Sequence, residues 1–422
     1  MKLCIYFNDI LSNMLSAYRK RFSCNNVIIK CIEEWKMFLD RKEYVGCLLM
    51  DLSKAFDCLP HGLLLSKLSA YGLHENACLF IKSYLSDRSQ RVKIDRSCSS
   101  WLQLKRGIPQ GSLLGPLLFN LFLNDLLIQL KDHCTVFNYA DDNSLSCHHS
   151  DLKSLVSNLE MASERALAWF DCNFMKANPD KFNLILLTGR NQHEEVTMQL
   201  RNTKITSVDE VKLLGVTLDK DLSFTPHIRN LCKKVAKQVN AMSRLSSMLS
   251  PQTKWSVFNS FVKSNFAYCT VVFHHCGVQN DKKLEKMHER AIRVVYNDYV
   301  SPYKTLLERS KRKLLYEERE DMLIELVFKV LHGLSPPIDN NMFVRQSFNH
   351  NLRDTNILKT PNYETVKFGF NSLKVSGALC WNRLPNAIKN CDTLGCLKNA
   401  LHNYRPQCEC GSCVKCFFYV SR

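Results

Sequence analysis

The sequence predicts a mixed α/β fold over about residues 1–225, followed by a mostly helical part. Three observations support this. Val45–Met50 is an apolar run of strand length that ends on Asp51. Thr135–Tyr139 and Ser144–Cys147 flank a tight turn, as the arms of a β-hairpin do. From about residue 226 onward, apolar residues recur mostly at helical spacing.

The remaining elements follow from periodicity and turn residues. Residues 10–40 have apolar positions at roughly helical spacing, interrupted by the basic stretch at 19–21, and predict a helical region. Residues 151–171 carry the clearest amphipathic stripe and predict a helix. The other expected elements are helices over 62–85, 113–130, 284–296 and 314–331, strands over 90–94 and 182–188, and turns at 107–112 and 178–180.

Composition limits the classes of protein. An apolar fraction of 45% over 422 residues excludes a disordered or low-complexity chain. The formal charge of +17 indicates a polyanionic partner, either nucleic acid or an anionic membrane surface. Residues 226–335 hold 19 Lys/Arg against 10 Asp/Glu, which is a surplus of nine. A solvated basic helical surface is the alternative interpretation of this surplus.

Export and membrane signals are not visible in the sequence. The start, MKLCIYFNDI, lacks a basic segment followed by a long apolar stretch, and no window approaches a membrane span. We therefore expect an intracellular protein, nuclear or cytoplasmic, that does not bind membranes. Its 20 cysteines are then expected to be reduced thiols.

Three aspartates form the candidate catalytic group. Asp51 follows a buried strand, and Asp141 and Asp142 are adjacent in the predicted hairpin turn. Phosphoryl transfer without a covalent intermediate uses two divalent metals held by carboxylates, which would offset repulsion among these side chains. The alternative is ordinary turn chemistry at Asp141–Asn143 and a helix N-cap at Asp51.

Five motifs in order resemble the palm of reverse transcriptases from non-LTR (LINE-type) retrotransposons. Tyr139–Asp142 matches their Y-x-D-D box, and Asp51–Asp57 matches D-x-S-K-A-F-D. Residues 106–112 are similar to their G-x-P-Q-G-S motif. Residues 175–182 and 213–216 resemble the next two motifs, and 381–385 resembles a short tail motif.

The resemblance implies a fold and a domain order. The expected fold class is an α/β (α+β) reverse-transcriptase palm with partial fingers, then a mostly helical thumb and a small C-terminal region. The corresponding ranges are 1–225, 226–335 and 336–422. The chain would begin within the fingers and would lack the endonuclease domain of these elements.

The resemblance also assigns roles at the metal site. Asp51 and Asp141 would bind both of two Mg²⁺ (or Mn²⁺) ions, Asp142 more peripherally, and the Leu52 carbonyl would complete one coordination shell. Lys181 would act as general acid toward pyrophosphate, and a solvated turn lysine is the alternative.

Further roles concern the substrates, which are dNTPs, an RNA template and a DNA primer. Phe56 would exclude a ribose 2′-OH, with core packing as the alternative, and Gln110 would line the template and nascent pair. Leu214 and Gly215 would form the turn that holds the primer end. The full set of implied substrate contacts is Arg19, Lys54, Phe56, Gln110, Gly111 and Tyr139.

Two questions stay open at this point. Cys408, Cys410, Cys413 and Cys416 supply four thiols, enough for Zn²⁺, but their one- and two-residue spacings crowd a tetrahedron, and free thiols are the favoured interpretation. The implied function is RNA-directed DNA polymerase. The alternatives are an inactive truncated copy and a domesticated, non-enzymatic RNA-binding protein.

Overall fold

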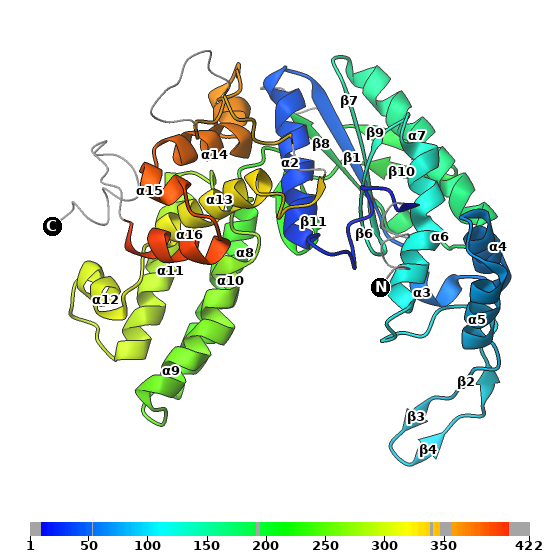
Figure 1. Ribbon diagram of the computed structural model, residues 1–422, viewed down its shortest axis with the longest axis horizontal. Helices are drawn as coiled ribbons and strands as arrows, with labels where there is room; N and C mark the ends of the chain where they lie inside the picture. Colours follow the sequence, from blue (N-terminus) through cyan, green and yellow to red (C-terminus); the bar gives the residue numbers. More distant parts are fainter. Residues whose placement is uncertain (1–9, 53, 191–194, 338–340, 347–355, 405–422) are drawn as a thin grey trace. The chain divides into compact units, whose positions relative to one another are not determined.

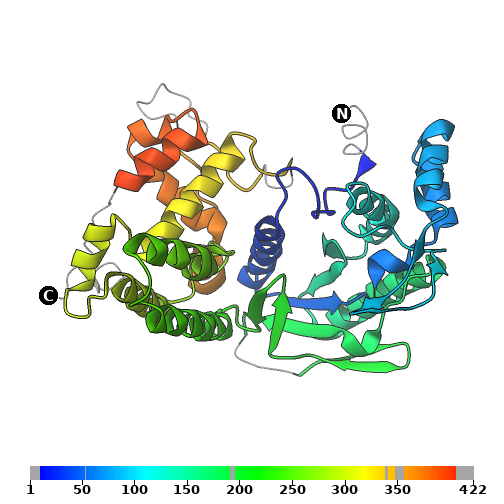
Figure 2. The ribbon, with the colours of Figure 1, turned by 90° about the horizontal axis from the view of Figure 1, so that it is seen from below.

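The computed structural model describes residues 10–52, 54–190, 195–337, 341–346 and 356–404. The chain divides into two compact units. Unit 1 contains residues 1–27 and 42–209, and unit 2 contains residues 28–41 and 210–422. The predicted boundaries at 225 and 336 remain predictions. Figures 1 and 2 show the helices and strands of both units.

A four-stranded antiparallel sheet forms the centre of unit 1. Helices α6 and α7 pack against it, with α7 on β7 and β1 and α6 on β6 (Figure 1). In sheet order, the strands are β6 (Thr135–Tyr139), β7 (Asp142–His149), β1 (Tyr44–Met50) and β8 (Asn183–Thr188), and the helices are α6 (Gly115–Leu130) and α7 (Leu152–Cys172). The predicted strands and both predicted helices of this layer are confirmed.

Helix α7 shows why the layer forms. Asp151 accepts a hydrogen bond from the Ser154 N–H and so caps the first turn. The apolar stripe of α7 is buried against the sheet, and Leu155 and Leu159 pack over Gly46 of β1. A Cβ at Gly46 would lie 3.3 Å from a Leu159 methyl carbon, so the small residue permits this close approach.

The rest of unit 1 lies between and after these elements. Three helices follow β1, and then a ribbon of short strands leads to the 106–112 loop. These are α3 (Ala55–Cys58), α4 (His61–Ala70), α5 (Glu75–Leu85), β2 (Ser89–Gln90), β3 (Lys93–Ile94), β4 (Ser97–Cys98) and β5 (Leu102–Gln103). A small hairpin of β9 (Thr197–Leu200) and β10 (Thr203–Thr206) follows β8.

Three sequence predictions for this unit are corrected by the structure. The helical region expected over 10–40 is interrupted over residues 11–23, and its main helix is α2 (Cys24–Asp40). The earlier residues form turns, because Tyr18 and Arg21 have positive φ and side chains of α6 bind the backbone of Ser12 and Ala17. The helix expected over 62–85 is divided at Gly72, where φ is 83°. The strand expected over 90–94 is two separate two-residue strands.

Unit 2 is mostly helical and begins with one hairpin. The hairpin is β11 (Glu210–Leu213) and β12 (Val216–Asp219). Part of α2, residues 28–40, belongs to this unit, where the Glu33 and Asp40 carboxylates accept backbone N–H groups of residues 364–374. The other helices are α8 (Thr225–Arg244), α9 (Pro251–Val257), α10 (Ser264–Ala267), α11 (Val278–Tyr296), α12 (Tyr303–Ser310), α13 (Leu315–Leu331), α14 (Leu373–Asn382), α15 (Asn386–Lys389) and α16 (Leu394–Asn403).

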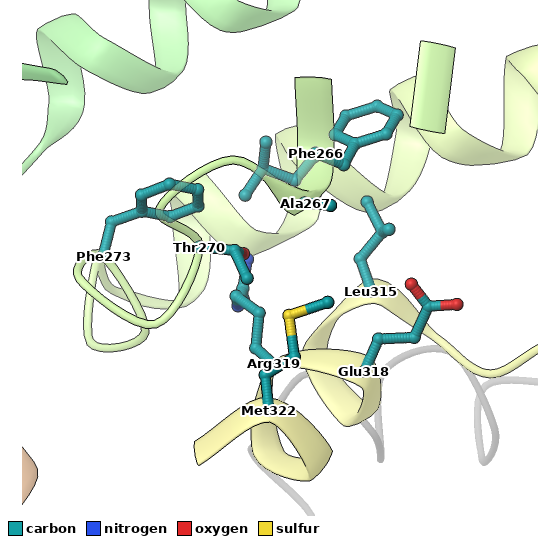
Figure 3. A pocket seen from close by; sticks show the side chains of 9 residues that line it. Phe266, Ala267, Thr270, Phe273, Leu315, Glu318, Arg319 and Met322 are labelled. Atoms are coloured by element: carbon teal, nitrogen blue, oxygen red, sulfur yellow. The ribbon is translucent and has the colours of Figure 1, made fainter. Parts of the chain in front are cut away.

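A buried ion pair lies in the core of unit 2. The Arg319 guanidinium of α13 bonds the Asp281 carboxylate of α11, and their side chains are 3% and 5% exposed. Figure 3 shows Arg319 beside Phe273 and Met322 at a cavity of about 10 Å³. Burial raises the pKa of the Asp281 carboxyl, and the positive charge of Arg319 opposes that rise. Among the helices that the structure describes, none is long and apolar enough to cross a membrane.

Candidate active site

The first carboxylate is placed by the middle of the sheet. Strand β1 pairs with β7 on one side and β8 on the other, and α7 packs on it. Its residues are mostly buried, and the sequence Val45–Met50 is correspondingly almost wholly apolar. Asp51 is the first residue beyond the strand, and its side chain is exposed. The strand therefore places one carboxylate at the end of the sheet where β1 terminates.

The other two carboxylates come from the β6–β7 hairpin. Tyr139 pairs with Asp142 and closes a two-residue turn of Ala140 and Asp141. Ala140 has a φ of 56°, which an alanine rarely adopts, so the surrounding contacts must hold the turn.

Two buried asparagines hold this turn from beneath. The Asn138 amide donates 2.9 Å hydrogen bonds to the Ala140 carbonyl and to the Asn143 side-chain oxygen. The Asn143 amide in turn donates to the Asp141 carbonyl at 3.2 Å. Both side chains are nearly inaccessible to solvent. Sequence reasoning missed Asn138, although a lone amide in an otherwise apolar strand was the available signal.

The register brings the three aspartates to one edge. Met50 pairs with Asn143, so Asp51 continues directly beside Asp142 in the antiparallel pair. Partial burial of the Asp142 carboxyl raises its pKa, and the negative charges of Asp141 and Asp51 add smaller contributions in the same direction. The strand register thus brings the backbones of the three residues together, whereas convergence of their carboxylates within reach of a shared metal ion stays a prediction.

Metal ligation itself is not shown. Among the residues that the structure describes, no three His, Cys, Asp or Glu side chains are already arranged to hold a metal ion. The donor set nevertheless suits Mg²⁺, because it consists of neighbouring carboxylates, and oxygen ligands are those that Mg²⁺ prefers. The metal assignments to Asp51, Leu52, Asp141 and Asp142 stay predictions. Cys408, Cys410, Cys413 and Cys416 lie outside the described residues.

A loop with Gln110 packs along the segment that follows Asp51. The Gly107 N–H donates to the Leu59 carbonyl at 2.8 Å, and the Ile108 N–H donates to the Phe56 carbonyl at 3.0 Å. Gly107 has a φ of 88°, and a Cβ there would lie 2.9 Å from the Asp57 Cα, so only glycine fits. The Gln110 amide donates to the Asp57 carboxylate at 3.0 Å. Gln110 is thereby oriented by a residue of the first motif.

Phe56 has an aromatic environment. Its ring stacks on Phe119 of α6, with 4.1 Å between centroids, and meets Tyr18 edge-on at 6.4 Å. The side chain is half-buried. One face is thus packed on the core while part of the ring stays accessible, so the steric role and the packing role are compatible.

Other predicted contacts differ in their surroundings. Arg19 donates from Nη1 to the Ser12 and Leu15 carbonyls at 2.7 and 2.9 Å, so part of its guanidinium holds the local turn. A hydrogen bond with Cys24, together with burial, raises the pKa of the Tyr139 hydroxyl to about 12. Its phenol therefore stays protonated at neutral pH.

The remaining residues lie at two places. Leu52 forms an isolated bridge with Ala177, which brings the turn that contains Lys181 next to the Asp51 segment. Lys54, with a φ of 52°, is exposed at the start of α3, and Gly111, with a φ of 78°, turns the loop beyond Gln110.

The predicted primer turn belongs to unit 2. Leu214 and Gly215 both have positive φ, as the type I′ hairpin turn requires. The Tyr268 hydroxyl donates to the Leu214 carbonyl at 2.6 Å, and its ring lies 3.3 Å from where a Gly215 Cβ would stand. Tyr268 was not identified from the sequence, because it lies 54 residues away along the chain.

Comparison with known proteins assigns the family. Residues 4–218, about half of the chain, match the model of the family described as reverse transcriptase (RNA-dependent DNA polymerase). The chain belongs to the reverse transcriptase family. This reverse-transcriptase domain is related to those of the non-LTR retrotransposons BS, jockey, X-element and R1, which confirms the resemblance seen in the motifs.

The similarity to individual relatives is partial. The chain is 27% identical to the probable RNA-directed DNA polymerase from transposon BS of Drosophila melanogaster, over 68% of this chain and 33% of the relative. It is also 27% identical to the RNA-directed DNA polymerase from mobile element jockey of the same species, over 52% of this chain and 24% of that relative. The chain thus spans about a quarter to a third of the length of those relatives. A telomerase structure from Candida albicans is similar at 13% identity and a TM-score of 0.39, covering 73% of this chain and 55% of that one, a likeness too weak to support an assignment.

Proposed function

We propose that this chain is an RNA-directed DNA polymerase that adds deoxynucleotides to a primer 3′-OH on an RNA template. The observation that supports the proposal is the strand register that brings Asp51, Asp141 and Asp142 to the same end of the sheet, where burial and then the charges of Asp141 and Asp51 raise the pKa of the Asp142 carboxyl. Family membership agrees with this chemistry. Carboxylates crowded in this way are suited to hold divalent cations.

Asp51 and Asp141 would hold two Mg²⁺ or Mn²⁺ ions, with Asp142 and the Leu52 carbonyl as further ligands. Bound there, the metals would activate the primer 3′-oxygen and stabilise the leaving pyrophosphate. The asparagine-held turn keeps Asp141 and Asp142 fixed while the substrate binds. Lys181, in an exposed turn beside the Asp51 segment, is our candidate proton donor to pyrophosphate.

Substrate positioning falls to the residues around the carboxylates. Gln110, oriented by Asp57, and the adjacent Gly111 would contact the template and nascent base pair. Arg19 and Lys54 would contribute positive charge toward the triphosphate, and Tyr139 would support the nucleotide beside the carboxylates. In unit 2, the Leu214–Gly215 turn that Tyr268 braces would hold the primer end.

Primer extension tests the proposal directly. The full chain should extend oligo(dT) on poly(rA) with dTTP in Mg²⁺ or Mn²⁺, and EDTA should stop the reaction. Tight binding of RNA without any extension in either metal would favour the non-enzymatic RNA-binding protein instead. Failure of both binding and extension would identify an inactive copy.

Phe56→Ala should admit ribonucleotides. Removing the half-buried ring takes away the bulk that would meet a ribose 2′-OH, and a lost steric exclusion of this kind costs discrimination on the order of a hundredfold. The ratio of kcat/KM for dTTP to that for UTP measures the change. Phe119→Leu, which alters the ring beneath Phe56, is the control for packing. Equal ratios in the parent chain and Phe56→Ala would refute the steric role.

The basic face of α8 should contribute affinity for the nucleic-acid backbone. Lys233, Lys234 and Lys237 are exposed opposite the buried stripe of α8, and none has an ion pair within the described part of the chain. If unit 2 contacts about five phosphates, log K should fall with log salt at a slope near −4 to −5. Glutamate at these three positions should flatten the slope by about two to three, whereas glutamate at Lys304, Lys311 and Lys359 should not. An unchanged slope would place the nucleic acid elsewhere.

A further inference from the structure

A two-stranded ribbon, residues 88–105, projects from unit 1 between α5 and the Gln110 loop (Figure 1). It contains two short ladders, β2 with β5 and β3 with β4, and each has only two residue pairs. Between them the Val92 N–H donates to the Ser99 hydroxyl, and the Ser99 N–H donates to the Val92 carbonyl. An isolated hairpin of this kind is marginally stable in water.

The ribbon exposes large apolar side chains. Val92, Ile94, Trp101 and Leu102 are 63%, 69%, 62% and 67% exposed. Four such residues on one short ribbon exceed the scattered apolar exposure that is usual on a protein surface. The ribbon thus has the character of a binding surface.

The ribbon is also positively charged. Residues 87–106 contain six Lys/Arg against two Asp/Glu, a surplus of four. None of these six cations makes an ion pair with any described residue. The Arg91 guanidinium carbon lies 4.6 Å from the centroid of the Trp101 ring, so a positive charge and an aromatic ring are adjacent on the ribbon.

A pocket of about 490 Å³ lies at the base of the ribbon. Arg88, Gln90 and Leu104 line it from the ribbon, and Lys54, Arg106 and Gln110 line it from the motif segments. Asp57 is the one carboxylate among the described lining residues, and Gln110 already bonds it. Basic side chains therefore occur both on the exposed ribbon and around the pocket beside the Gln110 loop.

We propose that the ribbon and this pocket bind the single-stranded RNA template ahead of the active site, an inference that rests on the proposed function. Unpaired bases would stack on Trp101, and Arg91, Lys93 and Arg96 would contact phosphates. A protein partner that binds by adding a strand to the edge of the ribbon is less suitable, because each ladder has an edge of only two residues. The surplus of cations complements a polyanion.

The test compares template–primer duplexes with and without a single-stranded template extension. Fluorescence anisotropy of the full chain would give a Kd for a blunt RNA–DNA duplex and for the same duplex with a 5′ RNA overhang of about twelve nucleotides. The parent chain should bind the overhang form more tightly. The ratio of the Kd for the blunt duplex to the Kd for the overhang duplex should fall about tenfold in Trp101→Ala and should stay close to the parent's in Trp101→Phe. The combined change Arg91→Gln, Lys93→Gln and Arg96→Gln should flatten the salt slope for the overhang form by about two.

Matched controls separate the ribbon from general surface effects. Tyr299→Ala removes an aromatic side chain of similar exposure in unit 2. Glutamine at Lys153, Arg165 and Lys204 removes the same charge from exposed positions of unit 1 outside the ribbon. Both should leave the gain from the overhang unchanged. All ribbon variants should keep the parent's melting temperature, because the substituted side chains are exposed.

Three results would overturn the proposal. One is an overhang gain that is equal in Trp101→Ala and the parent. Another is a gain that appears only when the overhang is on the DNA primer strand. A third is self-association of the parent that Trp101→Ala abolishes without changing RNA affinity, which would make the ribbon a protein interface. Primer extension by the parent chain is measured separately from binding. A chain that shows the overhang gain but extends no primer would contradict the proposed function and keep the ribbon proposal. A chain that extends primers but shows no overhang gain would do the reverse.

Discussion

Asp141→Asn should abolish primer extension and leave template–primer binding intact. The change removes one negative charge from the turn between β6 and β7 while keeping the shape of the side chain. Loss of metal-assisted phosphoryl transfer should lower kcat by at least about a thousandfold. Binding depends on Lys and Arg contacts with phosphates, so the Kd should stay the same or fall slightly as negative charge leaves the site.

Asp132→Asn is the matched control. It makes the same chemical change at an exposed aspartate of unit 1 that no described contact links to the three carboxylates. Its kcat should equal that of the parent. If Asp141→Asn keeps extension within about tenfold of the parent, the carboxylate does not hold the metals, and the assigned site is wrong.

Asp281→Ala should lower the free energy of unfolding by about 3–5 kcal/mol, because it leaves the buried Arg319 guanidinium without its partner. The substitution also removes the hydrogen bond that the Cys276 thiol donates to the Asp281 carboxylate at 3.3 Å. Urea unfolding followed by circular dichroism measures the change. Asp392→Ala, at an exposed position of the same unit, should change stability by no more than about 0.5 kcal/mol.

A double replacement distinguishes the ion pair from packing. Asp281→Leu together with Arg319→Met exchanges both charges for apolar groups, so no buried charge remains unpaired. The double variant should recover most of the stability that Asp281→Ala loses. If Asp281→Ala alone unfolds at the same urea concentration as the parent, the pair contributes nothing measurable to unit 2.

Local pattern was enough to predict the elements that carry the carboxylates. The apolar run Val45–Met50 predicted β1 because a short continuous apolar run is typical of a strand that is buried on both faces, and β1 is almost wholly buried. The hairpin around Asp141 followed from a turn between two strand-like runs, and α7 followed from its buried stripe. Adjacent carboxylates in a recognisable motif predicted the metal-dependent chemistry, and the family membership that the motif indicated is confirmed.

Local pattern failed where distant residues bind the backbone. The predicted helical region before Cys24 gives way to turns because the Asn120 and Asn124 side chains, about a hundred residues away, bind its backbone groups. Likewise, the carboxylates of α2 bind backbone N–H groups more than 300 residues along the chain, which places residues 28–41 in unit 2. Periodicity in a sequence carries no signal of such partners.

The sequence by itself determined the family and which residues are the candidates for its chemistry: the three aspartates, Gln110 and the basic helices. Only the tertiary structure decided how they are held. Asn138 supports the turn below Asp141, Asp57 orients Gln110, and Tyr268 braces Leu214. These partners meet through strand register and packing rather than through spacing along the chain, because a hydrogen bond depends on positions that the folded backbone sets. The aspartates could therefore be named from the sequence, whereas the contacts that fix them required the fold.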